Sequence, residues 1–310
     1  THAITLCLSG LLRPGDEFIS IAGSPYDTLR EVIGTEGNQD GTLLEYGIKY
    51  KEIPLKDGKI NTKEVIENIS KNTKLLLIQR STGYSTRKAI TIQEIKKVIE
   101  EIKGFNKEII IMVDNCYGEF VEKVEPTDIG ADIIAGSLIK NPGGGLALSG
   151  GYVAGKRDLV NRVANRSTAP GLGKDCGLTF GTTRTTLQGL FLAPHIVSDL
   201  FLENLIQAIE LNSPKRVIEF CQGIQKASAV DAHVIPMPWD MPGYEDEVIM
   251  ASGSFVDGSS MELSADGPMR EPFIVYYQGG LTYEHCKLGV MMSLDNLVKK
   301  NLIDKNKLIF

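Results

Sequence analysis

The stretch Glu108–Val113 (EIIIMV) is the feature that most limits what this chain can fold into. It is apolar at nearly every position and too short for a buried helix, so it predicts a strand covered on both faces. Lys74–Gln79 (KLLLIQ) has the same character, and Thr91–Lys103 between them places isoleucine and valine three and four residues apart. Strand, amphipathic helix and strand in this order predict an α/β domain with a mostly parallel sheet.

Other segments show the same alternation of helix and strand. We expect further helices over 2–12, 62–69 and 282–300, a mostly helical region over 185–225, and strands over 17–21, 48–54, 151–154, 233–237, 247–252 and 273–277, with one more near Ile133. The turn Asn212-Ser213-Pro214 predicts a boundary between a large domain, 1–212, and a smaller C-terminal α+β domain, 213–310.

The composition of the 310 residues is that of an ordinary globular protein, 42% hydrophobic and 23% charged. The net charge of −6 does not favour nucleic acid as a partner. The 5 cysteines contain no C-x-x-C pair and the 4 histidines have no metal-ligand spacing, so we expect a cytoplasmic protein without a metal site. The longest apolar stretch, 187–206, is interrupted by Pro194, His195 and Asp199, which argues against a membrane span.

The first residues, Thr1, His2 and Ala3, already lie in an apolar, helix-like run without a lead-in. Domains rarely begin inside a helix that has no cap. We therefore expect the native large domain to include a further N-terminal segment.

Lys140 stands between small residues and a glycine-rich turn in DIIAGSLIKNPGGG, residues 132–145. This pattern predicts an amine at the rim of a sheet with little bulk around it. A lysine whose pKa is lowered by an apolar or cationic setting can form a Schiff base with a carbonyl compound. The alternative is an ordinary surface lysine, which this stretch by itself favours.

Asp114 ends the apolar strand in VDNCYGEF, where a buried carboxylate requires a partner. The protonated ring nitrogen of pyridoxal 5′-phosphate (PLP) is one such partner, and a capped loop or an arginine is the alternative. Ser137, together with Thr1, His2 and Ala3 at a helix start, offers hydroxyl and N–H groups for a phosphate. Ordinary capping is the alternative for each of them.

Two further side chains are suited to binding a flat cofactor and a carboxylate. Tyr26 follows Gly-Ser-Pro at a helix start, where its ring can stack on a cofactor or simply pack. Arg270 lies between Pro268 and Pro272, and an arginine held in this way can bind a carboxylate with both nitrogens. A surface arginine is the alternative. Weaker candidates for anion binding are Arg80, Arg87 and Arg184.

Five blocks in this order, GSPYDTL, VDNCYGEF, GSLIKNPGGG, ELSADGPMREP and YYQGGLTYEH, resemble those of the methionine gamma-lyase-like family of PLP-dependent enzymes, also labelled aluminium-resistance proteins. The resemblance covers essentially the whole chain. It implies the aspartate-aminotransferase fold, fold type I, with PLP bound covalently to Lys140. It further implies that Asp114 pairs with the pyridine nitrogen and Tyr26 stacks on the ring. Ser137 and the backbone of Thr1–Ala3 would bind the phosphate, and Arg270 the α-carboxylate of the substrate.

The activity that this resemblance implies is a carbon–sulfur lyase, performing β- or γ-elimination on a sulfur amino acid such as cystathionine or methionine. Transamination, aldol cleavage and racemisation use the same cofactor, and a fold does not decide the reaction. A non-catalytic stress-response protein that retains the fold is the alternative from another class. The family also implies a small amino-acid substrate and a homodimer or homotetramer.

Overall fold

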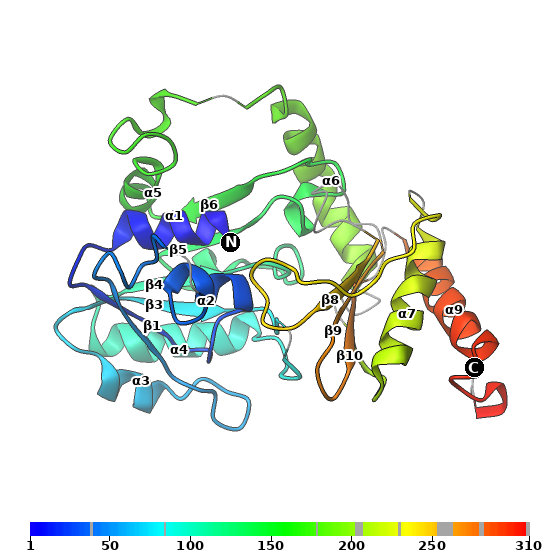
Figure 1. Ribbon diagram of the computed structural model, residues 1–310. Coiled ribbons are helices and arrows are strands. Elements are labelled where there is room, and N and C mark those ends of the chain that lie inside the picture. The colour runs from blue at the N-terminus through cyan, green and yellow to red at the C-terminus, as the bar shows by residue number, and fades with distance from the viewer. Residues whose placement is uncertain are drawn as a thin grey trace. The chain divides into compact units, whose positions relative to one another are not determined.

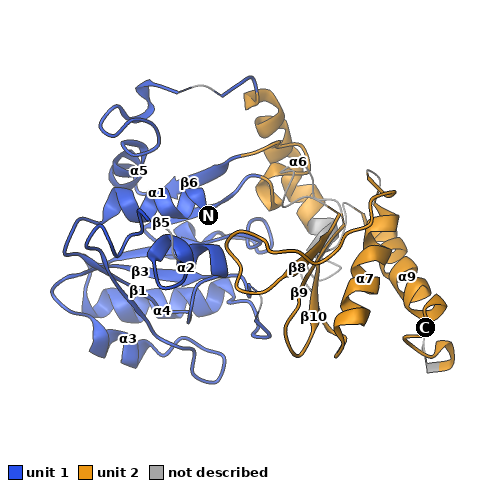
Figure 2. Cartoon of the chain, viewed as in Figure 1, with its two compact units in different colours: residues 1–138, 150–181 blue, residues 139–149, 182–310 orange. Residues whose placement is uncertain are grey.

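The computed structural model describes residues 1–37, 40–83, 85–177, 179–201, 207–228, 231–252, 263–278 and 282–307. The chain divides into two compact units (Figure 2), each described here by itself. The first unit contains residues 1–138 and 150–181, and the second contains residues 139–149 and 182–310. The boundary predicted at residue 212 stays a prediction, because a compact unit need not be a domain that folds independently.

The first unit is built on a six-stranded sheet in the order β2-β1-β3-β4-β5-β6 (Figure 1). All neighbouring strands are parallel except β6, which runs antiparallel to β5 at one edge. The strands are β1 (Glu17–Ser20), β2 (Lys49–Glu52), β3 (Thr73–Gln79), β4 (Ile110–Asp114), β5 (Ile133–Ser137) and β6 (Gly151–Gly155).

The sheet is buried on both faces, as its apolar strands predict. Along β3, Leu75 and Leu77 belong to the core on one face, and Leu76 and Ile78 to the core on the other. The first face is covered by α1 (His2–Leu11), α2 (Asp27–Ile33) and α5 (Arg157–Ala164), and the second by α3 (Thr62–Asn68) and α4 (Ile92–Phe105) (Figure 1). Short 3₁₀ turns complete this unit at η1 (Pro126–Ile129) and η3 (Gly173–Asp175).

The second unit has a four-stranded antiparallel sheet in the order β7-β10-β9-β8. Side chains of α7 such as Val217, Phe220 and Ile224 share one apolar core with Ile249 and Val275 of the sheet. The elements of this unit are η2 (Asn141–Gly143), α6 (Thr183–Phe201), β7 (Gln207–Glu210), α7 (Pro214–Ala227), β8 (Val248–Ala251), β9 (Ser264–Pro268), β10 (Ile274–Gln278), α9 (Tyr283–Lys299) and η4 (Lys305–Lys307).

The predicted fold class is confirmed: a mostly parallel α/β sheet is followed by a smaller α+β part. The strand predicted over 233–237 is wrong, since that segment forms no strand and Val234, Ile235 and Met237 are exposed. Pro236 and Pro238 lack the N–H groups that a sheet requires.

The mostly helical region predicted over 185–225 is interrupted by β7, which pairs with β10. The strand β9, with the sequence SADGP, was not predicted. Its small residues have low strand propensity, so only pairing with β8 and β10 makes it a strand. Among the described helices, none has the length and hydropathy needed to span a membrane.

The start of α4 provides a test of how local capping stabilises the first unit. The Thr91 hydroxyl accepts a hydrogen bond from the Glu94 N–H at 3.2 Å, and the Glu94 carboxylate accepts one from the Thr91 N–H at 2.9 Å. We expect Thr91→Ala to lower the free energy of unfolding by about 1 kcal/mol in urea titrations. Thr91→Ser retains the acceptor and should lose less than half of that. Equal losses in both variants would contradict this role of the cap.

Candidate functional site

The carboxyl ends of β1, β3, β4 and β5 meet at one edge of the first sheet because these strands are parallel. Ligands of open α/β sheets bind outside this edge. Asp114 is the last residue of β4, and it pairs in register with Gln79 on one side and Ala135 on the other. A site in the first unit is therefore expected at this strand-end edge.

Asp114 is buried, with 1% of its surface exposed. Its Oδ1 accepts a hydrogen bond from the Cys116 N–H at 3.1 Å, and its backbone oxygen accepts one from Arg80 N–H at 3.1 Å. The carboxylate thus turns the chain after β4 and lies at the carboxyl end of the strand. Its pairing with a cofactor nitrogen stays a prediction.

Ser137 and the start of α1 lie next to each other at this edge. Ser137 ends β5 and pairs with Gly151 of β6. A Cβ atom added to Gly151 would lie 2.9 Å from the Cβ of Ala3, so the first turn of α1 packs directly on that glycine. The helix has no acidic residue in its first turn and no side-chain cap. Its N–H groups and partial positive charge there suit an anion such as a phosphate.

The start of α2 joins the same edge. The Tyr26 N–H donates to Oε1 of Gln79 at 2.9 Å, at the end of β3. Two residues later, the hydroxyls of Thr28 and Thr1 are 2.8 Å apart, which ties α2 to the start of α1. Tyr26 is half-buried against the core on that face, while His2 is exposed. The structure thus brings together the predicted residues of this unit: Asp114, Ser137, Tyr26, Thr1, His2 and Ala3.

Lys140 belongs to the second unit and directly precedes η2, where its carbonyl accepts a hydrogen bond from the Gly143 N–H at 3.0 Å. Its connection with the residues of the first unit follows from the chain itself. Ser137 is three residues earlier, so the two Cα atoms lie within about 11 Å of each other however the units are arranged. Its predicted bond to a cofactor stays a prediction.

Two glycines hold the turn that follows Lys140. Gly144 has a φ of +53° and lies against the backbone of Gly189 in α6, and a Cβ atom on either glycine would overlap backbone atoms of the other segment. The helix and the turn are therefore packed at backbone distance. Gly189 was not singled out in the sequence, although an isolated glycine inside a helix pattern often marks close packing.

Arg270 has a partner in the second unit. Its Nη1 donates to Oδ2 of Asp246 at 3.0 Å. Both residues lie just beyond the paired ends of β8 and β9, where the Met269 N–H donates to the Glu247 carbonyl at 2.8 Å. Both side chains are about one-third exposed, at 36% and 34%, so this ion pair contributes little to stability. The binding of a substrate carboxylate by Arg270 stays a prediction.

The weaker arginine candidates mostly have structural partners. Arg80 is buried, and its guanidinium donates to the oxygens of Ile90, Asn115, Gly118 and Glu122. Arg87 donates to three backbone carbonyls, those of Gln79, Ser81 and Lys88, and burial lowers its pKa. Arg184 is exposed in the first turn of α6.

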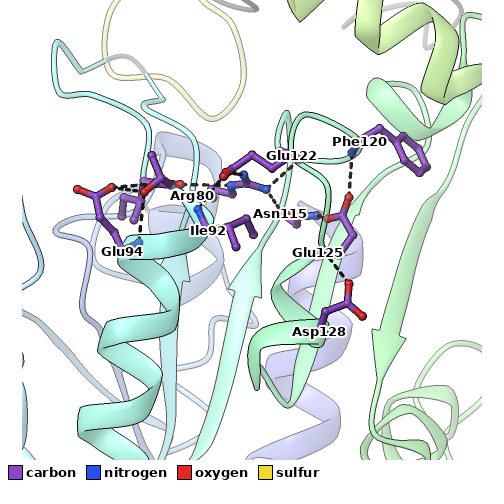
Figure 3. A network of polar contacts seen from close by, with 11 residues as sticks. Arg80, Ile92, Glu94, Asn115, Phe120, Glu122, Glu125 and Asp128 are labelled. Atoms are coloured by element: carbon purple, nitrogen blue, oxygen red, sulfur yellow. Dashed lines mark hydrogen bonds and ion pairs between the residues drawn. The ribbon is translucent and has the colours of Figure 1, made fainter.

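The loop that follows Asp114 is held by a network that the sequence did not reveal (Figure 3). Beyond its bond to Arg80, Asn115 donates through Nδ2 to Glu125 at 2.8 Å, and Glu125 accepts from the Phe120 N–H at 2.8 Å. The Glu125 N–H in turn donates to Asp128 at 2.8 Å. Tyr117 and Phe120 have φ angles of 66° and 63°, which non-glycine residues rarely adopt. These bonds maintain a strained loop beside the carboxylate of Asp114.

A cavity of about 540 Å³ lies at the other end of the sheet, next to the start of β5. It is lined by Lys103, Lys107 and Lys156 and by the buried Asp132. Lys103 and Lys156 both form ion pairs with Asp132, at 2.7 and 2.6 Å. Despite burial, which acts in the opposite sense, these bonds and the Ile111 N–H lower the pKa of Asp132. The lysines therefore neutralise a buried charge, and the cavity is not at the edge where such sheets bind ligands.

Comparison with known proteins identifies the family. The chain matches the family described as methionine gamma-lyase over residues 1–204 and 201–298. It belongs to the methionine gamma-lyase family. The predicted family and the predicted enzyme class, a PLP-dependent lyase, are thereby confirmed. Membership of this family implies PLP as the cofactor.

Several relatives are similar over almost the whole chain. Protein YnbB of Bacillus subtilis (strain 168) is 47% identical over 98% of this chain and 78% of its own. The crystal structure of a candidate cystathionine beta-lyase involved in aluminium resistance from Clostridium acetobutylicum has a TM-score of 0.88 and 49% identity, over 96% of this chain and 76% of that one. A carbon-sulfur lyase involved in aluminium resistance from Clostridium novyi NT has a TM-score of 0.87 and 46% identity, over 96% and 76%.

The PLP-dependent protein YhfS from Escherichia coli shares only the fold with this chain. It has a TM-score of 0.59 and 16% identity, over 96% of this chain and 78% of that one. This similarity supports the prediction that the chain has a fold found in PLP-dependent proteins.

The contact between α6 and the turn after Lys140 leads to a prediction. We expect Gly189→Ala to lower the free energy of unfolding by about 1–3 kcal/mol, because the added methyl group overlaps the backbone of Gly143. Gly104 in α4 is the matched control, since a Cβ atom there meets nothing within 4 Å. Gly104→Ala should be neutral or stabilise by up to about 1 kcal/mol. Thermal and urea unfolding would measure both, and an undiminished stability of Gly189→Ala would refute the close packing.

Proposed function

We propose that this chain is a PLP-dependent carbon–sulfur lyase that eliminates a thiol from the β or γ carbon of a sulfur amino acid such as cystathionine or methionine. The observation that supports it most is the strand-end edge of the first unit. There a buried carboxylate, a hydroxyl-bearing strand end and an uncapped helix start lie beside one another. The relatives named as carbon–sulfur and cystathionine beta-lyases support the choice of reaction.

The residues at this edge fit the parts of PLP. The first turn of α1 and Ser137 would bind the phosphate, since N–H groups and a hydroxyl meet there without an acidic side chain. The ring of Tyr26, which begins α2 beside this turn, would stack on the pyridine ring. Asp114 would accept a hydrogen bond from the pyridine N–H, and its negative charge would keep that proton in place.

Lys140 would hold the cofactor through a covalent bond to Nζ and, once displaced by the substrate amine, would move protons. Bound PLP supplies a sink for the electron pair left at the substrate α carbon. The Nζ amine would take the α proton, and for γ-elimination a β proton as well. The substrate then loses its thiol, and hydrolysis leaves a keto acid and ammonia.

Arg270 would orient the substrate by binding its α-carboxylate. Nη1 already donates to Asp246, which fixes the direction of the guanidinium plane. A fixed guanidinium can present its other N–H groups to a carboxylate with little loss of side-chain entropy. The predicted homodimer or homotetramer stays a prediction that sedimentation would settle.

The reaction is tested by the products of the full chain loaded with PLP. Incubation with cystathionine, cysteine, methionine and threonine should yield keto acid, ammonia and thiol from the sulfur amino acids. Lys140→Ala should lose the absorbance band near the visible edge that a lysine-bound PLP gives, and with it product formation, because no amine remains to bind the cofactor. Keto acid without ammonia would indicate transamination instead. Unchanged absorbance in Lys140→Ala would exclude Lys140 as the cofactor lysine.

Substrate binding provides a separate prediction for Arg270. We expect Arg270→Ala to raise the KM for every accepted amino acid by about tenfold or more, since a charge-assisted hydrogen bond is lost. Asp246→Asn is the matched control: it removes the same ion pair but retains the guanidinium, so KM should change less than about threefold. Equal KM values for Arg270→Ala and the unmodified protein would remove Arg270 from the site.

A further inference from the structure

Glu119 is a buried glutamate in the loop after β4 that none of these steps uses. Only 3% of its surface is exposed, and the Tyr152 hydroxyl donates a hydrogen bond to its Oε1 at 2.7 Å. It stands between Tyr117 and Phe120, two residues of this loop with left-handed backbone. The strained loop thus places this carboxyl group inside the first unit.

The carboxyl group of Glu119 presses against the end of β5. Gly136 leaves the space for it, since a Cβ atom there would overlap Oε1 of Glu119 and lie 2.5 Å from Cε1 of Tyr152. Gly136 stands between Ala135, which pairs with Asp114, and Ser137. The acid and the phenol therefore contact the backbone that separates two of the proposed cofactor residues.

Two acidic groups, Asp114 and Glu125, lie close enough to Glu119 to affect its pKa. Burial raises its pKa to about 8; the hydrogen bonds from Tyr152 and the backbone oppose this rise, and the charges of Asp114 and Glu125 add to it. Burial also raises the pKa of Tyr152, so the phenol remains a donor, and Cys116 lies close enough to affect it. Arg80 is committed to other oxygens of the same loop. These effects together favour the protonated form of Glu119 in the folded protein.

We propose that Glu119 is a positioning residue of the cofactor site: its carboxyl group, bonded to the Tyr152 hydroxyl, fills the space beside Gly136 and so fixes the end of β5 between Asp114 and Ser137. The inference rests on the proposed function for the identity of the cofactor. The role of Glu119 concerns geometry, because a negative charge buried between Gly136 and Tyr152 would be unfavourable.

The raised pKa of Glu119 makes the stability of the fold depend on pH in a definite direction. The unfolded chain loses this proton near pH 4.5 and the folded chain near pH 8, so the folded state binds more protons between these values. The stability due to Glu119 is fully present below pH 4.5 and is lost as the pH rises through about 8. Glu119→Gln cannot ionise, and its amide oxygen can still accept from Tyr152.

The test compares melting temperatures of the full chain without added PLP between pH 5 and 9. We expect Glu119→Gln to become more stable than the unmodified protein by several degrees as the pH rises to 9. Tyr152→Phe removes the hydrogen bond that lowers the pKa of Glu119. In that variant the loss of stability should therefore occur at a higher pH than in the unmodified protein. If the melting temperatures of the unmodified protein and Glu119→Gln change with pH in parallel, Glu119 is not protonated in the folded protein at neutral pH.

Glu17→Gln is the matched control, a buried glutamate at the other end of the same sheet. Despite burial, hydrogen bonds from Thr73, Lys51 and Ser70 lower the pKa of Glu17. The stability that Glu17 contributes is therefore present above pH 4.5 and is lost as the pH falls. Glu17→Gln should be less stable than the unmodified protein at neutral pH and should approach its stability in acid. Above neutral pH, Glu119→Gln should therefore raise the stability of the protein, whereas Glu17→Gln should lower it.

The positioning role is tested by titrating PLP and measuring its dissociation constant at pH 7 from absorbance. Glu119→Ala should weaken binding about tenfold, whereas Glu119→Gln should remain within about threefold of the unmodified protein. If Glu119→Ala does not fold, Tyr152→Phe serves in its place and should weaken binding measurably. If the unmodified protein binds PLP but no more tightly than Glu119→Ala, the role of Glu119 is wrong and the proposed function is unaffected. An unmodified protein that never binds PLP overturns the proposed function and the inference together.

Discussion

Burial of the parallel strands on both faces is the constraint on which the first unit depends. Leu75 and Leu77 on one face, and Leu76 and Ile78 on the other, require a layer of helices on each side. Crossover helices then bring successive strands into parallel order, and parallel order brings their carboxyl ends to one edge. The position of Asp114 beside the end of β5 follows from this packing and needs no interaction of its own.

The cost of this arrangement appears at the loop after β4, where polar groups are buried beside a carboxylate. Burying such groups is unfavourable unless each has hydrogen-bond partners. Arg80 and Glu125 supply them for backbone groups of the loop and for Asn115, and Tyr152 supplies one for Glu119. A loop held in this way can keep a chemical group in place without the mobility usual for loops.

At the turn after Lys140, backbone contact takes the place of side-chain packing. Gly144 and Gly189 allow the turn after Lys140 to lie directly against α6, so the turn has few ways to relax. A lysine that must both bind a carbonyl carbon and move protons benefits from such a turn, since small displacements of a reacting group are costly. The Arg270–Asp246 pair limits the movement of a guanidinium through an ion pair instead of glycine contact.

Local pattern in the sequence was sufficient for the strands β3 and β4, the helix α4, the fold class, and the candidates Asp114 and Lys140. These depend on periodicity, capping residues and turn residues that are neighbours in the chain. Tertiary structure decided the rest. It made a strand of the small residues in β9, left 233–237 without one, gave Arg80 structural partners, and placed Glu119 near two acids and a phenol. Each of these outcomes depends on residues far apart in the sequence, whose mutual distance and burial no local pattern specifies.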